Sequence, residues 1–258
     1  MEQHLRRKGS IGTLVAATEW LRRNPVLIVI FLLYGLLEAF SNSPGTLGLL
    51  FAVAAFLAVI YVDGLAHVIG EQEARGASSD IARASTTVRQ RYLSLFGATV
   101  VYVLAVAAGL IFFVLPGLYL AVRLSLAFPA CVIDDQDAVE SLKTSWTVAD
   151  GNLAKLVGIS LTWLFVFLGG MVVAFVATDL SVTDLNEGFS LTYFAATVVL
   201  TAIGSPIVQL AYARVYLENR PHSETDAGET DRREQPSWGA TDDGTQTERG
   251  DDRWRDDD

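Results

Sequence analysis

Residues 47–62 read LGLLFAVAAFLAVIYV, a stretch with no charged side chain. It is apolar on every side of a helix, whereas a surface helix of a water-soluble protein keeps a polar face. Extended to Ile69, the stretch reaches the roughly 20 residues that a helix needs to cross a bilayer. The sequence therefore predicts a membrane-spanning helix over 47–69.

Five other apolar stretches have a similar character. They cover residues 26–41, 95–115, 117–133, 153–178 and 191–217. The first of them is the shortest, at about 24 Å for a rise of ~1.5 Å per residue. A cleaved twin-arginine signal is the alternative for 26–41, but no small-residue cleavage site follows Phe40. We predict an all-α fold, a polytopic transmembrane helical bundle of about six spans.

Basic residues test this count independently. Of the 19 Lys and Arg residues, 18 fall in three kinds of place. They lie before the first span, in or beside the connections between spans two and three and between spans four and five, or from Arg214 onward. The remaining one, Arg123, lies inside a span, and the other three connections contain none. Lys and Arg favour cytoplasmic loops. The pattern predicts a multi-pass protein of the cell membrane with an even number of spans and both termini in the cytoplasm.

Each pair of predicted spans follows a short amphipathic segment, at 11–23, 79–92 and 137–149. Ser10, Ser79 or Asp80, and Asp137 are suitable N-caps for these segments. Helices of this kind lie in the headgroup region of a bilayer. We therefore expect three units, each an interfacial helix followed by a helical hairpin. In the second unit Pro116-Gly117 is either a tight hairpin or a kink, because proline interrupts the helical hydrogen bonds.

The last 40 residues differ sharply from the rest. From Glu218 onward there are 14 of the 29 acidic residues and 6 arginines, which give −8 of the net charge of −10. Such a composition buries too little apolar area to fold. We expect a transmembrane domain over 1–218 and a disordered acidic cytoplasmic tail over 219–258, available to a protein partner. The acidic excess resembles that of a salt-adapted cytoplasm and is unlike that of a nucleic-acid binder.

Ionisable side chains inside spans are candidate functional residues because they are costly there. Four stand out: Glu38, Asp63, His67 and Arg123. Asp63 and His67 share a helix face, and the depths of Glu38 and Arg123 permit an ion pair. These residues line a polar route for an ion, a proton or a lipid headgroup, or they are solvated or pair once to fix packing. The second interpretation is favoured because no carboxylate lies at the centre of a span.

Enzymatic signals are absent from the sequence. The histidines are scattered, Cys131 is the single cysteine, and no nucleophile motif or phosphate-binding loop occurs. We expect no catalytic, cofactor or metal site.

Two strings in the middle of the chain carry a family resemblance. They are VLPGLYLAVRLSLAFPACVIDD at 114–135 and AVESLKTSWTVADGNLAKLVGISL at 138–161. Pro116-Gly117, Arg123, Pro129, the SLKTSW run at 141–146 and Gly151-Asn152 resemble uncharacterised six-span proteins related to the glycerophosphodiester phosphodiesterase membrane domain. The resemblance implies the architecture over about Ser10 to Glu218. It implies no phosphodiester chemistry, because the soluble hydrolase domain is missing here.

These observations lead to an integral membrane protein without catalytic activity, expected to serve as a membrane scaffold or accessory module. The alternatives are a small-solute carrier or channel, and a lipid-handling protein that uses the interfacial helices. The expected partners are membrane lipids and a protein bound by the acidic tail, with no nucleic acid.

Overall fold

A computed structural model of the chain describes residues 7–177 and 191–220, and these are helical with no strand among them. The predicted tail, 219–258, lies outside the described residues from Pro221 onward. The helices are α1 (Ser10–Arg23), α2 (Pro25–Phe40), α3 (Gly45–Ala74), α4 (Ile81–Phe112), α5 (Val114–Arg123), α6 (Ala127–Ile133), α7 (Ala138–Ala149), α8 (Leu153–Ala177) and α10 (Leu191–Asn219).

Five segments are long and apolar enough to cross a bilayer: α3, α4, the α5–α6 segment over Val114–Ile133, and most of α8 and α10. The pair α1 and α2, bent by 95° at its junction, counts as a sixth if the pair is one span. Large apolar side chains point outward along these helices, for example Leu49, Leu104 and Phe165, each more than 60% exposed. Lipid, and not water, suits such a surface. The prediction of an all-α, multi-pass protein is confirmed.

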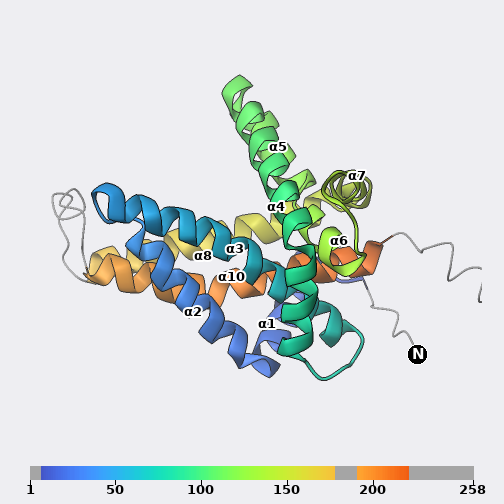
Figure 1. Ribbon diagram of the computed structural model, residues 1–258, viewed down its shortest axis with the longest axis horizontal. Helices are drawn as coiled ribbons and strands as arrows, with labels where there is room; N and C mark the ends of the chain where they lie inside the picture. The colour runs from blue at the N-terminus through green and yellow to red at the C-terminus, as the bar shows by residue number, and fades with distance from the viewer. Residues whose placement is uncertain (1–6, 178–190, 221–258) are drawn as a thin grey trace, which may run out of the picture. The chain divides into compact units, whose positions relative to one another are not determined.

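Helix α10 is the centre of the fold. It packs against α2, α3 and α8, and α1 lies against its C-terminal half. Figure 1 shows α2, α3, α8 and α10 side by side, with α4 and α5 paired in a different direction. The buried core draws residues from α1 to α4, α6 to α8 and α10, and it includes Leu65, Ile69, Leu210 and Tyr216.

The second predicted interfacial helix is not a separate element. The expected helix 79–92 and the expected span 95–115 form one continuous helix, α4. Asp80 caps it, since its side chain accepts a hydrogen bond from the Arg83 backbone amide at 3.0 Å. No glycine or proline interrupts the chain between Arg91 and Leu95, so nothing ends the helix there. The expected threefold repeat is therefore incomplete in its second unit.

The segment around Pro116 forms a tight hairpin, so the kink alternative is wrong. The break falls at Phe113, whose backbone is extended (φ −163°, ψ 151°), and Pro116 lies in the first turn of α5. An ideal Cβ built on Gly109 would lie 2.8 Å from the Gly117 Cα, so α4 and α5 touch through their backbones. The expected span 117–133 is not one helix, because the chain leaves helical geometry between Arg123 and Ala127.

The first and third interfacial segments are helices α1 and α7, close to their predicted bounds. Asp137 caps α7 as expected, since its carboxylate accepts from the backbone amides of Val139 and Glu140. Gly9, and not Ser10, is the N-cap of α1. Ser10 instead donates a hydrogen bond to the Lys155 carbonyl at 3.3 Å, which fastens α1 to α8.

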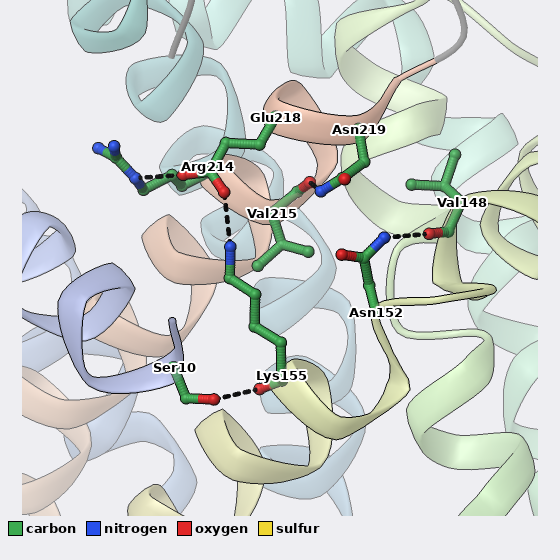
Figure 2. Close-up of polar contacts among 8 residues, drawn as sticks. All are labelled: Ser10, Val148, Asn152, Lys155, Arg214, Val215, Glu218 and Asn219. Carbon is green, nitrogen blue, oxygen red and sulfur yellow. Dashed lines mark hydrogen bonds and ion pairs between the residues drawn. The ribbon is translucent and has the colours of Figure 1, made fainter. Parts of the chain in front are cut away.

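A charged cluster fastens the C-terminal end of α10 to α8 and α1 (Figure 2). The Glu218 carboxylate, whose side chain is 0% exposed, accepts from Lys155 Nζ at 2.5 Å and from Arg214 Nε at 2.8 Å. The Arg214 guanidinium also lies 5.2 Å from the centre of the Trp20 ring of α1. One carboxylate thus pairs with cations from two helices, and we call Lys155, Arg214 and Glu218 the charged cluster.

Candidate functional site

A cavity of about 240 Å³ lies between α2, α3, α8 and α10, and we call it the polar cavity. Drug-sized ligands occupy about 300–1,000 Å³, so a space of this size suits a smaller organic molecule. It is lined by Phe31, Tyr34, Glu38, Val59, Asp63, Trp163, Phe167, Thr201, Ser205 and Gln209. Three of the helices that form it, α3, α8 and α10, are candidate spans, and α2 belongs to the bent α1–α2 pair.

Two carboxylates give the cavity its charge. Glu38 comes from α2 and Asp63 from α3, so α2 and α3 each contribute one. The Thr201 side chain of α10 lies beside Glu38, and the Gln209 side chain of α10 lies beside Asp63. Neutral donors satisfy oxygen atoms without cancelling charge, and no basic residue is among those that line the cavity in the described part of the chain. A carboxylate that is withdrawn from water without a counter-charge takes up a proton or binds a cation, so the site is suited to a cation.

Helix α10 supplies the polar side chains opposite these carboxylates. Thr201, Ser205 and Gln209 recur every four residues and therefore lie on one face of the helix. Thr197 continues the same face one turn earlier, and its Oγ1 is buried with no hydrogen-bond partner in the described structure. These four residues form a polar stripe along residues 197–209 of α10, which are otherwise apolar.

Aromatic rings make up most of the remaining wall. Phe31 and Tyr34 of α2 and Trp163 and Phe167 of α8 all line the cavity. Phe31 and Tyr34 meet edge to face, with their ring centres 6.5 Å apart, and Trp163 and Phe167 lie 5.8 Å apart. Carboxylates combined with aromatic faces are the groups that attract organic ammonium ions.

His67 does not line this cavity. It is fully buried in α3, one turn from Asp63, and its neighbours include the main chain of Gln209. Neither ring nitrogen has a hydrogen bond of good geometry within the described residues. Although Asp63 and His67 lie on the same face of α3, only Asp63 lines the cavity.

Arg123 lies elsewhere, and the expected Glu38–Arg123 pair does not form. Its guanidinium is 3.5 Å from the Asp150 carboxylate and donates a hydrogen bond to the Tyr119 hydroxyl at 2.6 Å. It also stacks over the Trp146 ring, 4.2 Å from the ring centre. Because three groups of α5, α7 and the following turn already surround it, Arg123 fastens α5 to α7.

A second hollow lies beside the polar cavity, between α1, α8 and α10, and we call it the apolar groove. It encloses about 260 Å³ and is lined by Leu14, Thr162, Trp163, Val166, Val199, Leu200, Ile203, Gly204, Ile207 and Val208. The one hydroxyl in its wall, that of Thr162, donates to the Gly158 carbonyl of its own helix at 2.7 Å. The groove therefore offers a ligand an apolar lining.

Sequence reasoning found both carboxylates of the cavity and missed its other polar residues. The signal for Tyr34 was its position one turn before Glu38, and the signal on α10 was the four-residue spacing of the polar stripe. Both patterns consist of uncharged side chains, which a search for ionisable groups in spans passes over.

The fold and the cavity define a multi-pass helical membrane protein with a polar space inside its bundle. Residues 99–218, just under half of the chain, match the model of a domain of unknown function, DUF7847. The match includes the strings that resemble the glycerophosphodiester phosphodiesterase membrane domain, but it shows no link to that domain. No curated protein and no solved structure matches the chain. Glu38 and Asp63 lie outside the matched segment, whereas the polar stripe of α10 lies inside it.

Proposed function

We propose that this protein binds a small organic ammonium ion in the polar cavity, within the membrane and without catalysis. The observation that carries the proposal is the pairing of Glu38 and Asp63 across a cavity with four aromatic rings and no basic residue in its lining. Charged side chains within spans mark the pathways and sites of membrane proteins. The role is that of a small-solute carrier or of a membrane receptor.

The ligand class follows from the wall of the cavity. An ammonium group is attracted by the charge of each carboxylate and by the ring faces of Tyr34 and Trp163. The cavity is much larger than a single metal ion, and the described residues hold no group of three or more His, Cys, Asp or Glu side chains suited to a metal. An organic cation therefore fits both the volume and the lining.

We further propose a cell-membrane location with both termini in the cytoplasm, from the distribution of Lys and Arg. The proposed partners are membrane lipids, through the outward apolar side chains, and a protein that contacts the acidic tail. The scaffold or accessory role favoured by the sequence needs no internal site. The scaffold or accessory role would be the better-supported function if the cavity bound nothing.

The test is calorimetric titration of the full chain in lipid nanodiscs with tetramethylammonium. We expect saturable binding, with Asp63→Asn weakening it by about 10- to 100-fold, since a contact with a charged group contributes about 1.5–3 kcal/mol. Asp63→Asn removes the charge with little change of shape, so the bundle keeps its packing.

Glu19→Gln is the matched control, because Glu19 is an exposed carboxylate of α1 outside the cavity. It should bind tetramethylammonium as the parent does. Absence of binding in the parent, equal binding by Asp63→Asn, or displacement of the ligand by equimolar Na⁺ would each contradict the proposal.

A further inference from the structure

One side chain separates the polar cavity from the apolar groove. Trp163 of α8 lines both of them, and it is the residue their walls share. The two hollows have opposite character, since one contains two carboxylates and the other has an apolar lining. Two adjoining spaces of this kind match a molecule with a charged end and an apolar end.

Helix α10 presents a different face to each hollow. Val199, Ile203 and Ile207 line the apolar groove, whereas Thr201, Ser205 and Gln209 line the polar cavity. The two sets interleave along the same stretch of helix, each with a spacing of four residues. The two sets are offset by two positions, about 200° around the helix, so the hollows lie on nearly opposite sides of α10 and flank its contact with Trp163 of α8.

Trp163 lies directly against Gly204. A Cβ built on Gly204 would come within 1.7 Å of the Trp163 ring, so the ring occupies the space where any other residue has a side chain. Trp163 is only partly buried, and the ring that it contacts, that of Phe167, is also partly buried. The partition is thus the Trp163 ring packed on the backbone of Gly204.

We propose that the ligand is an alkyl ammonium amphiphile, with its head in the polar cavity and its chain in the apolar groove. This inference rests on the proposed function and names its ligand class. The head pairs with the carboxylates of Glu38 and Asp63, and the Trp163 ring turns away from Gly204 so that the ligand extends from one hollow into the other. Such a molecule partitions into the bilayer, so the membrane itself delivers it to the groove between α1, α8 and α10.

The test compares tetramethylammonium with octyltrimethylammonium, below its micellar concentration, on the full chain in nanodiscs. The decisive variant is Val199→Trp, which places a large ring in the groove at a residue that is 51% exposed. We expect the parent to bind both cations. Val199→Trp should keep tetramethylammonium binding and weaken octyltrimethylammonium binding by at least tenfold, because the chain then has no space.

Val172→Trp is the matched control, since Val172 is 61% exposed on α8 and lines neither hollow. It should bind both cations as the parent does. This variant controls for any effect of an added surface tryptophan on the partitioning of octyltrimethylammonium into the lipid. Retained tetramethylammonium binding also shows that each variant is folded.

If Val199→Trp and the parent bind octyltrimethylammonium equally, the apolar groove takes no part and the inference is wrong, although the proposed function stands. If Val172→Trp loses octyltrimethylammonium as strongly as Val199→Trp, the effect is not specific to the groove and the inference is also wrong. If the parent binds neither cation, the proposed function itself fails.

Discussion

Replacing Glu218 by alanine should lower the free energy of unfolding by about 3–5 kcal/mol, the usual cost of removing one partner of a buried ion pair. Glu218 is fully buried, and its removal leaves Lys155 and Arg214, 12% and 7% exposed, without their carboxylate. The measurement is a reversible unfolding titration with SDS in mixed micelles. The free energy of unfolding falls because both cationic side chains stay buried and lose their counter-charge.

Asp150→Ala is the control for this prediction. Asp150 pairs with Arg123 at 3.5 Å, but its side chain is 74% exposed, and exposed pairs contribute about 0–1 kcal/mol. The triple change of Lys155, Arg214 and Glu218 to methionine should recover most of the stability, since an apolar replacement of a whole buried cluster is often neutral. A loss below about 1 kcal/mol for Glu218→Ala would show that the cluster is effectively solvated.

Replacing Gly109 by leucine should separate α4 from α5 and cost about 3 kcal/mol, the upper end of the usual range for overpacking. A Cβ at Gly109 meets the Cα and the N of Gly117 at 2.8 and 3.0 Å. Because these are backbone atoms, no side chain can move aside to relieve the overlap. The same SDS titration measures the loss.

Gly169→Leu is the matched control, because a Cβ at Gly169 of α8 would have no atom of another described helix within 4 Å. It should keep the stability of the parent or raise it by up to about 1 kcal/mol, because leucine is a better helix former than glycine. Equal losses for the two glycine variants would show that a general effect of the larger side chain, and not the close approach of α4 and α5, sets the cost.

The helical, membrane-spanning character of the chain followed from composition alone, because stretches such as 47–62 have no polar face. Breaks between helices were harder to predict. Leu95 follows the expected interfacial helix with no breaker, so α4 continues through it. Leu124–Leu126 contains no glycine or proline, yet the chain leaves helical geometry there. The local signal for this break is Pro129, which has no backbone N–H to donate to the Ser125 carbonyl one turn earlier.

The candidate site was only partly predictable, because its residues come from helices that are far apart in the sequence. Position in a span identified Glu38 and Asp63, but it gave no partner for either of them. Their neighbours on α10 are Thr201 and Gln209, at sequence separations well above a hundred residues. Arg123 was matched to Glu38 by depth alone, whereas the actual contacts are Asp150 and two aromatic rings.

The position of α10 at the end of the described chain has a consequence for synthesis. Glu38 and Asp63 leave the ribosome early, while the hydroxyl and amide groups that face them arrive with one of the last helices. Until α10 has been synthesised, the two carboxylates lie in the membrane without the donors of the finished fold. A newly made chain therefore completes its polar cavity in a single late step, and any pause before residue 197 leaves the α2–α3 hairpin dependent on water or chaperones.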